Sequence, residues 1–214
     1  IAALEAANRY PEFLPEQLRR VIAARIGVPA TQVILGAGAT GVILQVLHAL
    51  TSPGDRIVMA EPTFDGYPII AAMNRLQTMS IPLTRDGHHD LAAMAEAARD
   101  ARVLVICRPH NPTGTVESAA AIETLLARLP DTLVVLDEAY VEFVAGAHRI
   151  DSTTLVQRFA NVVVLRTFSK AYGLAGLRIG YGFGSRELAD SLWAMQLPFG
   201  MSVTSLVAVE ASYL

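Results

Sequence analysis

Short apolar runs alternate with amphipathic helical segments along most of the chain, and this alternation most restricts the fold. Six runs have the length of a strand and are largely apolar, at residues 33–35, 57–60, 78–82, 103–107, 133–136 and 162–165. Strands that are apolar on both faces are typical of a parallel sheet with helices on each side. The sequence therefore predicts an α/β fold in three layers (α/β/α), with a mostly parallel sheet flanked by helices on both faces.

Helical periodicity fills the intervals between these runs. The expected helices cover residues 16–26, 42–50, 67–75, 91–99, 118–128 and 153–159, and two more follow at 187–195 and 203–214. Only short turns connect the segments, so no internal domain boundary is evident and residues 1–214 are expected to form one domain. Because the chain starts at Ile1 and stops inside an expected helix, we expect a fragment truncated at both ends.

Lys170 is the only lysine in the chain, alongside sixteen arginines. The amine of a lysine can lose its proton when it is desolvated and can then condense with a carbonyl, whereas a guanidinium stays charged. Lys170 follows the run 162–165 and so lies at the carboxyl end of a predicted strand, where α/β sheets bind ligands. This placement indicates Schiff-base chemistry, and a surface lysine that escaped replacement is the alternative.

A glycine-rich turn at residues 36–41, Gly-Ala-Gly-Ala-Thr-Gly, follows a predicted strand and precedes a helix. Backbone N–H groups and the positive end of the helix dipole bind phosphate at such a turn. The pattern also matches a dinucleotide-binding fingerprint, with Glu61 about 20 residues further on as the ribose-binding acid. The motif therefore indicates a phosphate without naming the ligand, and a tight turn with no ligand is the third interpretation.

Polar side chains follow several predicted strands. Asn111 lies in a turn after one strand, Asp137 ends the next and is followed by Tyr140, and Arg178 comes eight residues after Lys170. Because the carboxyl ends of parallel strands meet at one edge of a sheet, we expect these groups to converge there. A buried carboxylate such as that of Asp137 needs a cationic partner. Nicotinamide chemistry has no use for the amine, whereas pyridoxal 5′-phosphate (PLP) uses each of these groups.

An ordered set of motifs resembles a known family. It runs from Arg9-Tyr10-Pro11 through Glu61-Pro62-Thr63-Phe64, Asn111-Pro112-Thr113-Gly114 and Asp137-Glu138-Ala139-Tyr140 to Ser169-Lys170 and Arg178. In this order, and over nearly the whole chain, the motifs resemble the class I/II PLP-dependent aminotransferases of fold type I, near the histidinol-phosphate and aromatic amino acid aminotransferases. The resemblance implies the PLP-binding large domain, with the small domain largely absent.

The resemblance also implies individual roles. Lys170 would hold PLP as a Schiff base and, once freed, move the substrate Cα proton, while Asp137 would pair with the pyridine nitrogen. Asn111 and Tyr140 would bond the phenolic oxygen, and Phe64 would stack on the ring. The residues implied for the phosphate are Ala39, Thr40, Thr167, Ser169 and Arg178, together with Tyr10 from a neighbouring subunit, which implies a homodimer with shared active sites.

The activity implied by the resemblance is amino-group transfer, in amino acid biosynthesis, from an aromatic amino acid or histidinol phosphate to a 2-oxo acid such as 2-oxoglutarate. The segment Phe64-Asp65-Gly66-Tyr67-Pro68 and the Ala-Thr-Gly turn are closer to the aromatic enzymes, whereas the match around Lys170 is shared with the histidinol-phosphate enzymes. The arginine that binds the substrate carboxylate in this family belongs to the small domain, so the donor is left open. Another fold-type-I enzyme, such as a phospho-amino-acid decarboxylase, and a PLP-binding module without catalysis are the alternatives.

Charge and composition argue against other classes. A net charge of −3 with mixed signs gives no basic surface for nucleic acid. No apolar run reaches the ~18 residues of a membrane span, and the N-terminal stretch does not read as a signal peptide. The single cysteine, Cys107, has no disulfide partner in the chain, so a reducing compartment, the cytoplasm, is expected. His88-His89-Asp90 is interpreted as a polar turn before a helix, and no metal is expected.

Overall fold

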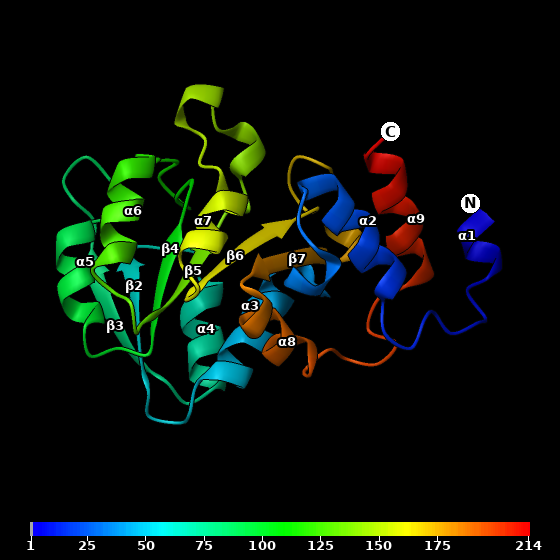
Figure 1. The fold of residues 1–214 in the computed structure, drawn as a ribbon, viewed down its shortest axis with the longest axis horizontal. Coiled ribbons are helices and arrows are strands. Elements are labelled where there is room, and N and C mark those ends of the chain that lie inside the picture. The colour runs from blue at the N-terminus through cyan, green and yellow to red at the C-terminus, as the bar shows by residue number, and fades with distance from the viewer. Residues whose placement is uncertain (1) are drawn as a thin grey trace.

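In the part of the chain that the structure describes, seven strands form one sheet in the order β1-β7-β6-β5-β4-β2-β3 (Figure 1). A computed structural model describes residues 2–214 of the chain. The strands are β1 Val33–Ala37, β2 Arg56–Glu61, β3 Gln77–Pro82, β4 Val103–Cys107, β5 Leu133–Asp137, β6 Val162–Thr167 and β7 Ile179–Gly184. The pairs along the order from β6 to β3 are parallel, and β7 is antiparallel to both its neighbours, β1 and β6. The expected mostly parallel sheet is confirmed.

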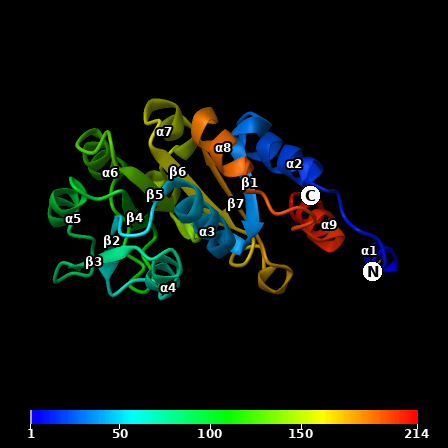
Figure 2. The same cartoon turned by 90° about the horizontal axis from the view of Figure 1, so that it is seen from below.

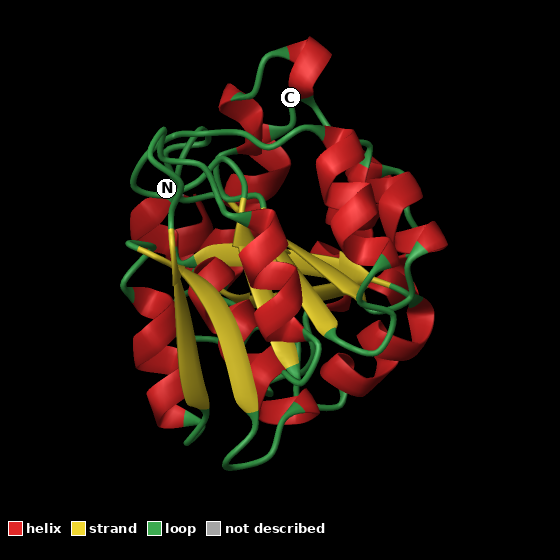
Figure 3. Cartoon of the chain, turned by 90° about the vertical axis from the view of Figure 1, so that its left-hand side faces the viewer, coloured by secondary structure: helices red, strands yellow, loops and turns green. Residues whose placement is uncertain are grey.

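Helices cover both faces of this twisted sheet (Figures 2 and 3). They are α1 Ala2–Glu5, α2 Glu16–Ile26, α3 Gly38–Leu50, α4 Gly66–Met73, α5 Leu91–Ala98, α6 Ala119–Ala127, α7 Ser152–Arg158, α8 Arg186–Trp193 and α9 Val203–Ser212. Short 3-10 helices lie at Ala30–Gln32, Val141–Phe143, Gly146–His148 and Ala175–Leu177. Within residues 2–214, no helix has both the length and the apolar composition needed to span a membrane.

Two separate apolar cores lie against the two faces of the sheet. One contains buried side chains of α2, α5, α6, α7 and α9, and the other contains those of α3, α4 and α8. Strands β4, β5 and β6 contribute alternate residues to each core, which explains why their sequences are apolar throughout. The predicted three-layer arrangement is therefore confirmed, and the central strands are held from both sides.

Strand β7 is the element that the apolar-run criterion misses. Its sequence alternates Ile179, Tyr181 and Phe183, which are buried in one core, with glycines on the other face of the sheet, where Gly180 and Gly182 lie against α3. A Cβ atom at Gly180 would lie 2.2 Å from the carbonyl carbon of Gly38. The glycines therefore let the start of α3 pack directly on the strand, and they remove the apolar signal on which sequence analysis depends.

Helix α3 begins at Gly38, four residues before the predicted start, so most of the glycine-rich turn is the first turn of the helix itself. No side chain caps this end, whereas Asp90, Ser118 and Asp151 accept backbone N–H bonds at the starts of α5, α6 and α7. The first backbone N–H groups of α3 are thus left without an internal partner, at the carboxyl edge of the sheet.

Candidate active site

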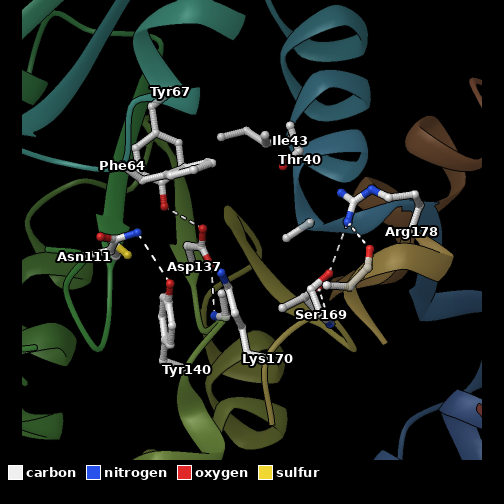
Figure 4. A pocket seen from close by; sticks show the side chains of 15 residues that line it. Thr40, Ile43, Phe64, Tyr67, Asn111, Asp137, Tyr140, Ser169, Lys170 and Arg178 are labelled. Atoms are coloured by element: carbon white, nitrogen blue, oxygen red, sulfur yellow. Dashed lines mark hydrogen bonds between the residues drawn. The ribbon is translucent and has the colours of Figure 1, made fainter. Parts of the chain in front are cut away.

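A pocket of about 260 Å³ opens at the carboxyl ends of β4, β5 and β6, facing the start of α3 (Figure 4). The predicted site residues that line it are Ala39, Thr40, Phe64, Asn111, Asp137, Tyr140, Thr167, Ser169, Lys170 and Arg178. These residues come from segments far apart in the sequence, and the strand ends bring them together as expected. Their individual roles stay predictions.

Asp137, the last residue of β5, is buried with only 5% of its surface exposed. Its Oδ2 atom accepts a hydrogen bond of 2.5 Å from the Tyr67 hydroxyl, and its Oδ1 atom accepts one of 2.9 Å from the Ala139 backbone N–H. Burial raises the pKa of Asp137, and the two hydrogen bonds and the charge of Lys170 oppose that rise. The carboxylate therefore gains from any further positive charge placed beside it.

The neighbouring acid, Glu138, already has a cationic partner, Arg166, on the other side of the sheet edge. Its Oε2 atom accepts two bonds from the Arg166 guanidinium, at 2.9 and 2.8 Å, and its Oε1 atom accepts one of 2.6 Å from Ser152. Burial lowers the pKa of Arg166 and Glu138 raises it, and the net effect is a raised pKa. Of the two consecutive acids, only Asp137 is available to the pocket.

Lys170 lies in the loop after β6, on the same side of the pocket as Tyr140. Its Nζ atom is 5.1 Å from the centroid of the Tyr140 ring, and its side chain is exposed to solvent. The desolvation that was expected to make this amine reactive is thus not supplied by burial in the described residues. Asp137 is the acid in the pocket lining, and the charge of Lys170 acts to lower its pKa, against the rise caused by burial.

Donors gather at the opposite end of the pocket, around Arg178. The Nη1 atom donates to Ser169 Oγ at 3.3 Å and to the Ala175 carbonyl at 2.8 Å, and the Nη2 atom donates to the Ala37 carbonyl at 3.3 Å. Arg178 has a left-handed backbone (φ 52°), and its guanidinium crosses Gly38, where a Cβ atom would lie 2.4 Å from Nη2. A fixed cation, a hydroxyl and the uncapped start of α3 thus form a cradle for an anion.

Ser169 is fixed within this cradle by Thr167. The Thr167 hydroxyl donates to Ser169 Oγ at 3.0 Å and accepts the Ser169 backbone N–H at 3.1 Å. Thr167 itself is 5% exposed at the end of β6. The serine hydroxyl is therefore held in one orientation next to Arg178 before any ligand is present.

Asn111 and Tyr140 face each other across the other side of the pocket, with 3.5 Å between Asn111 Nδ2 and the Tyr140 hydroxyl (Figure 4). Cys107 also lines the pocket, and its thiol donates to the Pro109 carbonyl at 3.3 Å. Burial raises the pKa of Cys107 to about 12, so the group is a neutral thiol at physiological pH. These three residues give this end of the pocket polar but uncharged groups.

Sequence reasoning missed several residues that line the pocket. They are Ile43, Tyr67, Cys107, Ala139 and Ala175. Tyr67 carries the strongest missed signal, because it lies in the first turn of α4, three residues after the predicted site residue Phe64. Phe64 itself precedes the helix, so helical spacing does not relate the two rings.

Tyr10 is the predicted site residue that the structure leaves outside the pocket. Its side chain is 83% exposed and its ring lies 4.8 Å from that of Phe199.

The segment His88-His89-Asp90 has a structural role, since Asp90 caps α5 and His89 Nδ1 lies 2.8 Å from Glu117 Oε1. In residues 2–214, no group of three or more His, Cys, Asp or Glu side chains is arranged to hold a metal ion.

Comparisons with known proteins agree with this geometry. The family model "Aminotransferase class I and II" matches residues 1–213. An aromatic amino acid aminotransferase of Cutibacterium acnes is 44% identical over 207 residues, which are 96% of this chain and 59% of that protein. Histidinol-phosphate aminotransferase 1 of Cupriavidus pinatubonensis is 43% identical over 214 residues, covering 98% of this chain and 56% of that protein.

Solved structures show the same fold. Histidinol-phosphate aminotransferase from Sinorhizobium meliloti, in complex with pyridoxal-5′-phosphate, has a TM-score of 0.90 and 29% identity over 99% of this chain and 59% of that one. L-threonine-O-3-phosphate decarboxylase from Porphyromonas gingivalis has a TM-score of 0.84 and 27% identity, over 98% and 62%. The chain spans about 59% of the length of the first curated relatives that it matches.

The dinucleotide alternative requires Glu61 to bind a ribose. In the described residues, Glu61 is exposed and lies outside the lining of the pocket.

Proposed function

The chain belongs to the class I and II aminotransferases, and from that premise we propose that residues 1–214 form the PLP-binding large domain of a longer enzyme that transfers amino groups. One observation carries the proposal: an amine, a buried carboxylate and an anion cradle open into a single pocket. PLP presents an aldehyde, a basic ring nitrogen and a phosphate, which are the three complementary groups.

The donor set fits this cofactor. Asp137 is buried and its pKa is raised, so a protonated ring nitrogen would supply the positive partner that the described side chains give only through Lys170. The cradle of Ser169, Arg178 and the start of α3 would hold the phosphate, with Ala39, Thr40 and Thr167 beside it. Phe64 would lie against the ring, and Asn111 and Tyr140 would hydrogen-bond the phenolic oxygen.

Each residue then has a task in the reaction. PLP, when bound, supplies an electron sink that stabilises negative charge at the substrate Cα. Lys170 would take the proton from that carbon as a general base and could later give it up as a general acid. Asp137 would pair with the ring nitrogen and keep it protonated, and Arg178 would hold the phosphate in place.

For substrates, we propose a ring-bearing amino donor, either an aromatic amino acid or histidinol phosphate, and a 2-oxo acid acceptor such as 2-oxoglutarate. The support is that relatives of both names are more than 40% identical to this chain. Phospho-amino-acid decarboxylation is the second candidate, because the Porphyromonas gingivalis decarboxylase has the same fold with 27% identity. A location in the cytoplasm is part of the same proposal.

We further propose that the enzyme is a homodimer in which Tyr10 reaches the phosphate held by a second copy. Tyr10 is exposed and lies outside the pocket of its own chain, next to the exposed rings of Phe13 and Phe199. Subunit mixing tests this arrangement in the full-length enzyme. Lys170→Ala and Tyr10→Ala preparations should each be weakly active alone and regain activity when mixed, whereas independent sites would give no gain.

The main test is the absorption spectrum of the full-length enzyme with PLP, before and after reduction by borohydride. We expect a yellow protein in which reduction fixes the cofactor covalently, and we expect both Lys170→Ala and Lys170→Arg to lose the fixation, because neither side chain forms the imine. Covalent fixation that persists in Lys170→Ala would overturn the assignment.

Single-turnover assays with phenylalanine, histidinol phosphate, aspartate, alanine and phosphothreonine separate the candidate substrates. We expect conversion of the cofactor to its amine form with one of the ring-bearing donors. Carbon dioxide released from phosphothreonine would select the decarboxylase, and fast conversion by aspartate or alanine alone would refute the proposed donor class.

A further inference from the structure

Tyr67 enters the pocket from the first turn of α4 and bonds Asp137 directly (Figure 4). Its side chain is 1% exposed, and its hydroxyl donates to Asp137 Oδ2 at 2.5 Å. Burial and the charge of Asp137 raise the pKa of Tyr67 well above 10. The phenol therefore keeps its proton at physiological pH and donates a hydrogen bond to the carboxylate.

With this bond, both oxygen atoms of Asp137 are held. Oδ1 accepts the Ala139 backbone N–H at 2.9 Å, so rotation of the carboxylate would break one bond or the other. A donor to a carboxylate also stabilises its ionised form. A carboxylate that is stabilised in this way competes less for a proton that it shares with a neighbouring nitrogen. Tyr67 thus controls both the direction and the basicity of Asp137.

Phe64, whose ring is expected to stack on the cofactor, lies next to Tyr67. The rings of Phe64 and Tyr67 meet edge to face, with centroids 5.3 Å apart and an interplanar angle of 88°. Gly66 lies between them in sequence, and a Cβ atom there would be 2.3 Å from Phe64 Cε1. Residues 64–67 therefore work as one unit, because the position of one ring fixes the position of the other.

We propose that Tyr67 is a positioning residue of this site, which holds the Asp137 carboxylate in place for the cofactor ring nitrogen and couples that contact to Phe64. The inference rests on the proposed PLP function and adds a residue to it. The competing explanation is packing alone, since the Tyr67 ring belongs to the buried core of α3 and α4. The two differ in what the hydroxyl does, and Tyr67→Phe removes the hydroxyl while it keeps the ring.

The sharpest probe is a cofactor analogue, 1-deaza-PLP, in which a carbon replaces the ring nitrogen. In the wild-type enzyme, PLP should bind more tightly than the analogue because only PLP contacts Asp137 through nitrogen. In Tyr67→Phe the ratio of the two dissociation constants should fall about tenfold, the effect of removing one hydrogen bond to a charged group. A packing defect would weaken both ligands equally and leave the ratio unchanged, which would overturn the proposal.

Tyr181→Phe is the matched control, because Tyr181 is also buried but belongs to the other core and lies outside the pocket lining. It should leave the ratio at the wild-type value. Should Tyr67→Phe fail to fold, 3-fluorotyrosine at position 67 keeps the ring and makes a stronger donor. That variant should raise the ratio, and a fall would contradict the proposal.

A pH titration of the absorbance of bound PLP gives a second readout. Without the Tyr67 hydroxyl, Asp137 takes a larger share of the proton that it shares with the ring nitrogen, so the ring is less positive and the absorbance change moves to higher pH. The midpoint should rise by about one pH unit in Tyr67→Phe. If the wild-type enzyme shows no PLP absorbance, the proposed function fails. If it shows normal absorbance and Tyr67→Phe moves neither readout, only the role of Tyr67 fails.

Discussion

The two ends of the pocket are built by different means. At the phosphate end, where we propose that Arg178 holds the cofactor phosphate, the close approaches are made by backbone and glycine: Gly180 lies against the start of α3, and Gly38 lies under the Arg178 guanidinium. At the ring end, where we propose that Asp137 holds the cofactor ring, buried side chains contact one another, with Tyr67 bonded to Asp137 and packed on Phe64. The phosphate end should therefore be sensitive to substitutions that add atoms. The ring end should be sensitive to substitutions that remove a single atom or change a charge.

The largest effect is expected from Gly180→Ala. The new Cβ atom would lie 2.2 Å from the Gly38 carbonyl carbon and 2.3 Å from the Ala39 backbone nitrogen, and backbone atoms cannot move aside as a side chain can. We expect a loss of about 3 kcal/mol or more in the free energy of unfolding, together with weaker PLP binding. Gly176→Ala is the control, because a Cβ atom at that position would have no atom within 4 Å. Denaturant titration of both variants would refute the distinction if their losses were equal.

The second prediction concerns the charge at the ring end. The pKa of Asp137 is raised by burial above its ordinary value of 3.8, so the folded state holds this proton more tightly than the unfolded chain. The stability that the group contributes is present below 3.8 and is lost as the pH rises through the folded pKa. In the absence of cofactor, the free energy of unfolding of Asp137→Asn should therefore rise relative to that of the wild type as the pH rises. The gain is about 1.4 kcal/mol for each pH unit by which the fold raises the pKa of Asp137.

Chemical denaturation of both proteins across the pH range, with PLP removed, measures this difference. The same substitution should weaken PLP binding, because the neutral amide cannot hold the ring proton. A stability difference that stays constant with pH would show that Asp137 titrates alike in the folded and unfolded chain.

Gly38→Ala should have a smaller effect, and Gly27→Ala isolates its cause. Both glycines have nearly the same left-handed backbone, with φ of 75° and 76°, so the strain of about 1–2 kcal/mol is common to both substitutions. Only position 38 also meets the Arg178 guanidinium, at 2.4 Å, whereas no atom lies within 4 Å at position 27. We expect similar losses of stability, but a loss of affinity for PLP relative to unphosphorylated pyridoxal only in Gly38→Ala. Equal affinities in the two variants would argue against the cradle.

The smallest effect is expected at Cys107. Its pKa is raised to about 12 by burial, so thiolate-directed reagents should not modify the folded protein up to about pH 9. Cys107→Ser keeps a small polar group there and should change the PLP dissociation constant less than about twofold. Rapid labelling of the native protein by iodoacetamide at about pH 8 would contradict the buried position.

Much of the fold can be predicted from the sequence because the central strands are apolar on both faces, and so stand out as continuous apolar runs. The runs in β4, β5 and β6 are apolar throughout since they meet both cores, and the predicted bounds lie within two residues of the observed ones. β7 gives no such signal, because all three residues on one of its faces are glycine, two of them against α3 and Gly184 near Leu188 of α8. The start of α3 is obscured for a related reason, since Gly36, Gly38 and Gly41 indicate a turn whether or not a helix has begun.

The pocket is predictable in part. Strand-end residues such as Asp137 and Lys170 are found because their place in the chain fixes their place in space. Tyr67 is not found, because only the approach of α4 to β5 reveals that its hydroxyl reaches a carboxylate 70 residues away. The exposure of Lys170 and the distance of Tyr10 from the pocket are likewise tertiary facts that no local pattern encodes.

The position of β1 at the edge of the sheet has a consequence for the order of synthesis. Its one partner strand in the described sheet is β7, and Ala37 bonds Arg178 across 141 residues. At roughly 5–20 residues per second, a ribosome completes β7 about 7–30 s after β1, and in that interval β1 has no strand to pair with. The anion cradle therefore closes after the other end of the pocket has been made, and a nascent chain can retain PLP firmly only once β7 has emerged.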